Sequence, residues 1–145
     1  MTNEQKLEEI NRRILAIRLR GAAEGWTGEQ TYHAYKDLLP LEVVLVDYPR
    51  SVVNLINCFL YLFPHVHEEP DNLNGWLKNH GYAEISSVSG AEIYVLYIKG
   101  NWVHIGRVLD VHTATSKWGR EEPVFRHPLA LQPLQYDTIE FFRKR

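Results

Sequence analysis

The sequence predicts an α+β domain in which helices pack on a small antiparallel sheet. Helical periodicity and helix N-cap signals fill the first half of the 145-residue chain, whereas short runs rich in β-branched and aromatic residues follow Gly90. With 45% hydrophobic residues, a chain of this length can bury one core. We therefore expect a single domain over residues 1–145, with a helical N-terminal extension over residues 1–40.

The charge of the chain is nearly balanced. It has 16 basic and 18 acidic residues, and its formal net charge of -2 creates no field that favours nucleic acid or an anionic membrane. No apolar run is long enough to span a bilayer, and the first residues lack the basic-then-apolar order of a secretory signal. These features predict a cytoplasmic protein with no nucleic-acid or membrane partner.

Two helices are expected before Pro40. The first covers about Asn3–Ala23, stops near Gly21, and packs on the core through apolar residues spaced three and four apart, namely Leu7, Ile10, Ile14 and Ile17. Its other face is charged and solvated. Thr27 and Gln30 form the pattern of a capping box, which predicts a second helix running to about Leu39.

Cys58 is the only cysteine of the chain, and the extended, β-branched run 51–56 precedes it. Asn57 is a suitable N-cap for a helix from Cys58 to about Phe63. A thiol in the first turn feels the positive end of the helix dipole, which lowers its pKa and favours a nucleophilic role. The alternative is that Cys58 is a small buried core residue, as free cysteines often are.

A single cysteine excludes an internal disulfide and a multi-cysteine zinc site. His65 and His67 lie beside Glu68 and Glu69 in a segment bounded by prolines, but two histidines and adjacent carboxylates define no metal geometry. We interpret them as solvated loop residues and expect neither a metal nor a cofactor. Asp71 is then the expected N-cap of a helix over Asn72–Asn79 that ends at Gly81.

The second half of the chain predicts the sheet. A hairpin joins strands over 91–98 and 102–109 through Lys99-Gly100-Asn101. A third strand is expected within 110–119. A short segment over 124–129 and a last strand over 138–142 complete the pattern.

His104 lies on the second of these strands. The two-residue period of a strand places it on the face of Trp102 and Gly106, opposite Val103 and Ile105. Gly106 leaves room beside it for a neighbour or a substrate. A thiol nucleophile needs a histidine that the fold brings close, so His104 is the best candidate base; the alternative is a solvated histidine on the polar side of the strand.

Several short motifs, in their order along the chain, resemble a bacterial family of uncharacterised domains related to the papain-like, NlpC-type cysteine peptidases and amidases. The resemblance covers about Val53–Arg143. The motifs are Asn57-Cys58-Phe59, Gly81-Tyr82, Trp102-Val103-His104-Ile105-Gly106-Arg107-Val108, Ser116-Lys117-Trp118-Gly119, His127-Pro128-Leu129 and Tyr136-Asp137.

The resemblance implies a papain-like core over 53–143, with Cys58 as nucleophile and His104 as base. It implies Ser116 as the third catalytic member, with His112 as the alternative. The residues that it implies for substrate binding are Asn57, Trp102, Lys117 and Trp118. The peptidases carry Asp before the cysteine and Ser-Gly after it, where this chain has Asn57 and then Phe59-Leu60.

Three functions follow from these observations. The first is a cysteine hydrolase or acyltransferase that acts on an amide or ester of a peptide or other acyl substrate. The second is a catalytically inactive papain-like domain that serves as a binding module. The third is an interaction protein that pairs through its amphipathic N-terminal helix.

Overall fold

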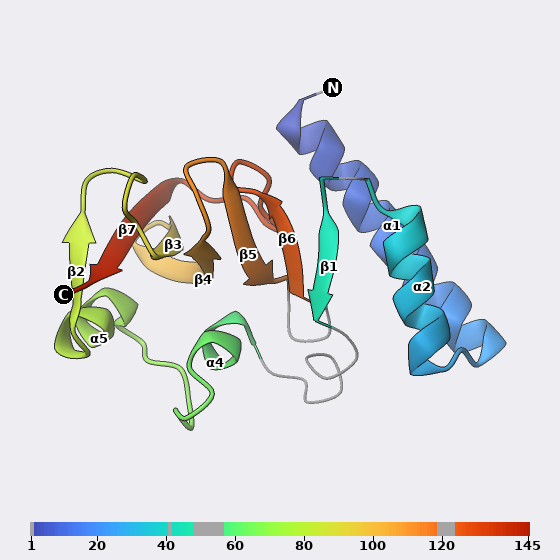
Figure 1. Cartoon of the computed structure of the whole chain (residues 1–145), viewed down its shortest axis with the longest axis horizontal. Helices are drawn as coiled ribbons and strands as arrows, with labels where there is room; N and C mark the ends of the chain where they lie inside the picture. Colours follow the sequence, from blue (N-terminus) through green and yellow to red (C-terminus); the bar gives the residue numbers. More distant parts are fainter. Residues whose placement is uncertain (1, 41, 48–56, 119–123) are drawn as a thin grey trace.

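The computed structural model describes residues 2–40, 42–47, 57–118 and 124–145. Within them the chain is an α+β protein whose strands form one seven-stranded sheet of order β1-β6-β5-β4-β3-β7-β2, with every neighbouring pair antiparallel (Figure 1). This confirms the predicted class. The strands are β1 (Val44–Asp47), β2 (Tyr82–Ile85), β3 (Ile93–Ile98), β4 (Asn101–Val108), β5 (Thr113–Lys117), β6 (Val124–Pro128) and β7 (Thr138–Lys144).

The N-terminal extension is a pair of helices, α1 (Asn3–Glu24) and α2 (Gly28–Leu38), which lie beyond the β1 end of the sheet in Figure 1. The buried face of α1 is the predicted one, with Ile10, Ile14 and Ile17 all buried. The helix passes through Gly21 and ends instead at Gly25, whose φ of 65° lies in the left-handed region that glycine adopts without strain.

The start of α2 confirms the predicted capping box. The Gln30 N–H donates to Thr27 Oγ1 at 3.2 Å, and the Thr27 N–H donates to Gln30 Oε1 at 2.8 Å. Two of the amides that a helix start leaves unpaired are thereby satisfied. Tyr35 is the buried residue of α2 that packs with Phe125 of β6 in the core shared with α1.

Two shorter helices cover one face of the sheet. They are α4 (Cys58–Leu62) and α5 (Leu73–Asn79), drawn below the sheet in Figure 1. Asn57 caps α4 as predicted, because its Oδ1 accepts the Leu60 N–H at 2.8 Å. The N-cap of α5 is Asn72 and not Asp71, since the Asn72 side chain accepts the Gly75 N–H at 3.0 Å.

The two faces of the sheet carry separate cores. Ile93, Val95 and Ile105 pack with Phe59 and the rest of the α4–α5 core, whereas Tyr94 and Leu96 face the opposite side with Ala114. This alternation follows from the two-residue period of a strand. Because both faces of the central strands are buried, the central sheet is held from both sides.

Two predicted features fall on residues outside the described ranges. The expected turn at 47–50 and the extended run 51–56 lie there, apart from Asp47, which ends β1. Gly119 and the expected break at 121–123 lie outside them as well. The segment over 41–46, which the sequence left open between strand and helical turn, contains the start of β1.

The β3–β4 hairpin offers a direct test of turn chemistry. Lys99 has a φ of 50° and Gly100 a φ of 82°, so both central residues adopt the left-handed conformation of a type I′ turn. Lysine is strained there, whereas asparagine tolerates it better. We expect Lys99→Asn to raise the free energy of unfolding in urea by about 0.5 kcal/mol; a loss of stability would contradict this interpretation of the turn.

Candidate functional site

A cleft of about 640 Å³ gathers most of the residues that the sequence singled out. It lies where β4 and β5 have separated: the two strands pair at Arg107 with Thr115 and at Val108 with Ala114, and the cleft is lined by residues beyond that pairing. Its lining comprises Asn57, Cys58, Glu69, Pro70, Asp71, Asn101, Trp102, Val103, His104, Lys117, Trp118 and Leu134.

A β-bulge in β4 shapes one wall of this cleft. Leu96 pairs with His104 and Tyr97 with Trp102, so Val103 is an additional residue on β4. Trp102 therefore packs with Phe59 in the α4–α5 core, while His104 lies beside Tyr94 on the opposite face. This corrects the prediction that Trp102 and His104 share a face, because a regular period of two does not continue through a bulge.

Cys58 approaches the cleft from α4, below the sheet. The Val108 N–H donates to the Glu92 carbonyl oxygen and therefore points toward β3. Successive backbone N–H groups of a strand point to opposite sides, so the Ile105 N–H, three residues earlier, points the other way, toward β5 and the cleft. That N–H donates toward the sulfur of Cys58. The thiol thus lies against the backbone of the residue that follows His104.

The environment of Cys58 keeps its thiol protonated. Burial raises the pKa of Cys58 above its ordinary value, and the negative charge of Glu69 raises it further, whereas the Ile105 N–H opposes both. The sequence led us to expect a lowered pKa from the helix dipole. The structure gives the opposite direction, because α4 has only five residues and the loss of hydration outweighs the favourable N–H contacts.

His104 is almost completely buried, with 2% of its surface exposed. Its Nε2 atom has no hydrogen-bond partner among the described residues. Burial, together with the smaller effect of the neighbouring His127, lowers the pKa of His104 to about 3. The imidazole is therefore neutral at pH 7, and the resting site holds a neutral thiol and a neutral histidine. The alternative of a solvated histidine is wrong.

Ser116, the implied third catalytic residue, bonds to a different histidine. Its Oγ lies 2.9 Å from His127 Nε2, and His127 Nδ1 lies 2.9 Å from the Pro128 carbonyl oxygen. A carbonyl oxygen can only accept, so His127 Nδ1 carries the proton and donates to it. Burial lowers the pKa of His127, which keeps the ring neutral, so Nε2 is the acceptor and the Ser116 hydroxyl donates to it. Ser116 thus fixes the orientation of His127, which in turn lies near His104.

The alternative third member, His112, is exposed in the turn between β4 and β5 and is not among the residues that line the cleft. The four residues implied for substrate binding, Asn57, Trp102, Lys117 and Trp118, all line it. Lys117 is 1% exposed and Trp118 7%. Trp118 Nε1 is a second buried polar atom with no hydrogen-bond partner in the described part of the chain.

Glu69 lines this cleft although the sequence did not indicate it as a site residue. Asn57 Nδ2 donates to Glu69 Oε2, which brings the carboxylate to the start of α4. Nothing in the spacing of Glu69 and Cys58 along the chain indicates this contact. The one indication in the sequence is Asn57 itself: when its Oδ1 caps the helix, its Nδ2 group is still free to donate to a carboxylate.

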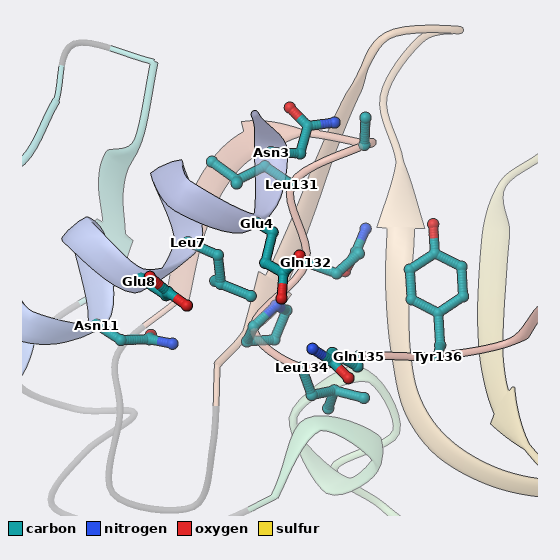
Figure 2. A pocket seen from close by; sticks show the side chains of 12 residues that line it. Asn3, Glu4, Leu7, Glu8, Asn11, Leu131, Gln132, Leu134, Gln135 and Tyr136 are labelled. Carbon is teal, nitrogen blue, oxygen red and sulfur yellow. The ribbon is translucent and has the colours of Figure 1, made fainter. Parts of the chain in front are cut away.

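A second cavity, of about 550 Å³, lies between the start of α1 and the 130–136 segment (Figure 2). Glu4, Leu7 and Glu8 of α1 line it on one side, opposite Gln132 and other residues of the 130–136 segment. Leu134 lines both cavities. None of the residues predicted for catalysis or substrate binding lines the second cavity.

Among the described residues, no group of three or more His, Cys, Asp and Glu side chains is arranged to hold a metal ion. In the same part of the chain, no helix combines the length and the apolar character that crossing a membrane requires.

When the chain is compared with protein-family models, with curated proteins and with solved structures, no match is found.

Proposed function

We propose that the protein is a thiol-dependent acyl hydrolase or acyltransferase with a papain-like arrangement, in which Cys58 is the nucleophile and His104 the base. The observation that carries the proposal is that both side chains line one cleft, with the sulfur against the Ile105 N–H and the His104 Nε2 unpartnered. A buried nitrogen without a partner is costly, and a reaction that uses it explains why it is retained.

In this mechanism the neutral imidazole is the form that is ready to act. As the sulfur of Cys58 attacks the acyl carbon, its proton passes across the shared cleft, by way of one water molecule, to His104 Nε2, because the two side chains line the cleft from different faces of β4. That proton then goes to the leaving amine or alcohol when the C–N or C–O bond breaks. Water attacks the resulting thioester, again with His104 as base, and releases the acid and the free thiol. An acyltransferase would use an amine or alcohol in place of water.

The backbone around Cys58 supports the charge that develops during this reaction. The N–H groups of Ile105 and Phe59 are directed at the sulfur and favour its ionised form. They act in a partly buried site, where an N–H dipole interacts more strongly with a charge than it does in water. The Ser116–His127 pair lies near His104 and is a positioning element in this scheme.

A second candidate is supported by the protonation states. Cys58 and His104 are both neutral at rest, and the contacts of the described residues include no partner for His104 Nε2. Such a pair is also what an inactive papain-like domain would hold if its cleft served only to bind peptides. Formation of a covalent acyl-enzyme separates the two candidates.

The test is exposure of the native protein to p-nitrophenyl acetate, followed by intact-mass analysis and by the release of p-nitrophenol. We expect one acetyl group per chain on Cys58 and a burst of p-nitrophenol. Cys58→Ala should abolish the adduct. His104→Gln should slow acylation by about 100-fold or more, because the proton acceptor is lost while the side-chain size is nearly kept.

The exposed His33→Gln variant serves as the control for loss of a histidine, and it should acylate like the wild type. A wild-type protein that is acetylated no faster than Cys58→Ala, or an adduct on another residue, would refute the hydrolase and leave the binding module. Acylation at Cys58 that is unaffected by His104→Gln would remove His104 from the mechanism.

A further inference from the structure

Two carboxylates line the cleft together with Cys58. Glu69 and Asp71 are both exposed and both line the cavity. Glu69 is held by the Asn57 side chain, whose Nδ2 donates to Glu69 Oε2 while its Oδ1 accepts the Leu60 N–H. The Glu69 carboxylate is therefore fixed at the start of α4, near enough to the thiol for its charge to raise the pKa of Cys58.

The same short segment is tied to the opposite wall. The indole Nε1 of Trp102 donates to the Pro70 carbonyl oxygen at 2.9 Å, and the Trp102 ring packs against Phe59 with the ring centroids 6.3 Å apart. Residues 69–71 are thus anchored to α4 through Glu69 and to β4 through Pro70. A carboxylate fixed in this way needs little ordering when a ligand binds.

An independent observation indicates that this cleft receives a ligand. His104 Nε2 and Trp118 Nε1 are buried polar atoms on cleft-lining side chains, and neither has a partner in the described part of the chain. Polar atoms in a protein interior are seldom left unpaired unless they have a binding or catalytic role. The two exposed carboxylates therefore line the same cleft as two side chains with buried, unpartnered polar atoms.

The charged and titratable groups around the thiol come from three elements. The 69–71 segment contributes Glu69 and Asp71, β4 contributes the neutral His104, and β5 contributes Lys117. Lys117 is 1% exposed, whereas both carboxylates are exposed to solvent. A charged ligand that enters the cleft meets the negative charges first.

We propose that the cleft selects acyl substrates that carry a cationic group, with Glu69 and Asp71 as the residues that bind this group. The inference rests on the proposed function and gives it a substrate class: amides or esters with an ammonium or guanidinium group near the scissile bond. The indole of Trp102, which also lines the cleft, suits the same group.

Binding of the cation also acts on the nucleophile. The charge of Glu69 is one of the causes that raise the pKa of Cys58, after burial. A cation placed against Glu69 offsets this repulsion and makes proton transfer from the thiol easier. The correct substrate thereby activates the thiol that attacks it, while neutral or anionic compounds meet the less reactive resting form.

The test measures the modification of Cys58 by two methanethiosulfonate reagents of similar size, one with a trimethylammonium group and one with a sulfonate. In both, the sulfur of Cys58 forms a disulfide with the reagent and methanesulfinate leaves, so no enzymatic turnover is needed. We expect the cationic reagent to react faster. Glu69→Gln should reduce the ratio of the two rate constants by about fivefold, and Asp71→Asn should reduce it to a similar degree.

Glu68→Gln is the matched control, because Glu68 is the exposed neighbour of Glu69 but does not line the cleft. Its ratio should equal that of the wild type. Glutamine at position 69 can still accept the hydrogen bond from Asn57, so the fold of the 69–71 segment is kept. Unfolding midpoints equal to that of the wild type verify this for each variant.

The charge selectivity is refuted if Glu69→Gln and Asp71→Asn leave the ratio unchanged, or if Glu68→Gln lowers it equally, which would indicate a general surface field. The outcome is separable from that of the proposed function. Selectivity without acylation, either by p-nitrophenyl acetate or by a p-nitrophenyl ester that carries a trimethylammonium group, would refute the hydrolase alone. Acylation without selectivity would refute the cationic substrate class alone.

Discussion

Gly106→Ala is expected to destabilise the protein by about 3 kcal/mol, which makes it the most damaging small substitution in the sheet. A Cβ atom at position 106 would lie 2.4 Å from the hydroxyl oxygen of Tyr94 and 2.5 Å from two carbons of its ring. Tyr94 is fully buried and donates a hydrogen bond to Gln132 at 3.0 Å, so its ring has no free space into which it can move. Urea unfolding of the variant measures the loss.

A double-mutant cycle provides the control for this prediction. In a Tyr94→Leu background the ring that meets the new Cβ is absent, so Gly106→Ala should cost much less than it does in the wild type. An equal cost in both backgrounds would contradict the steric explanation. The sequence indicated that Gly106 leaves room for a neighbour or a substrate; the structure shows that the neighbour is Tyr94.

Acid is expected to destabilise the protein in a pH range where most carboxylates are still ionised. His104 has a pKa of about 3 in the folded protein and about 6.5 when unfolded, so protonation favours the unfolded chain. Its stabilising contribution is complete above pH 6.5 and falls as the pH decreases toward 3. Between pH 6.5 and 4 we expect a loss of about 3 kcal/mol from His104 alone. Burial lowers the pKa of His127 too, so it adds in the same direction.

Urea unfolding at several pH values between 7 and 4 measures this slope. His104→Gln should reduce the slope of the free energy of unfolding against pH by about 1.4 kcal/mol per pH unit, because the variant no longer takes up this one proton on unfolding. The exposed His33→Gln variant should keep the slope of the wild type. If His104→Gln leaves the slope unchanged, the histidine is not buried in a neutral form and the description of the cleft is wrong.

Local signals in the sequence predict the helices and the hairpin well. Thr27 and Gln30 form the expected capping box, Asn57 caps α4, and the Lys99-Gly100 turn joins β3 to β4. Each of these features depends on contacts within four residues of the chain. Such contacts are encoded by residue types at fixed spacing, so the sequence is sufficient to identify them.

Features that depend on distant pairing were missed. β2 was not predicted, because Tyr82–Ile85 is four residues long and is stabilised by pairing with β7, about 60 residues later. The bulge at Val103 was missed for the same reason: the additional residue is visible only against Leu96 and Tyr97 of β3. One additional residue reverses the face of every preceding side chain, which is why the orientation predicted for Trp102 relative to His104 was wrong.

The residues of the candidate site were easier to predict than their protonation states. Cys58, His104, Lys117 and Trp118 line one cleft as the sequence motifs imply. Their pKa values depend on burial, and burial is decided by elements far along the chain that cover them. The dipole of α4 alone would lower the pKa of Cys58, but burial of the thiol by other elements has the larger effect and raises it.

The pH dependence of Cys58 alkylation by iodoacetamide under native conditions tests the central claim, a neutral thiol and a neutral histidine that share an accessible cleft. We predict labelling of the folded protein with an apparent pKa above the usual ~8.5 of a cysteine and no inflection near pH 6.5. A thiol that reacts only after unfolding would show that the cleft does not reach Cys58. An apparent pKa well below 8.5 that rises in His104→Gln would instead show a preformed thiolate–imidazolium pair and contradict the neutral resting state.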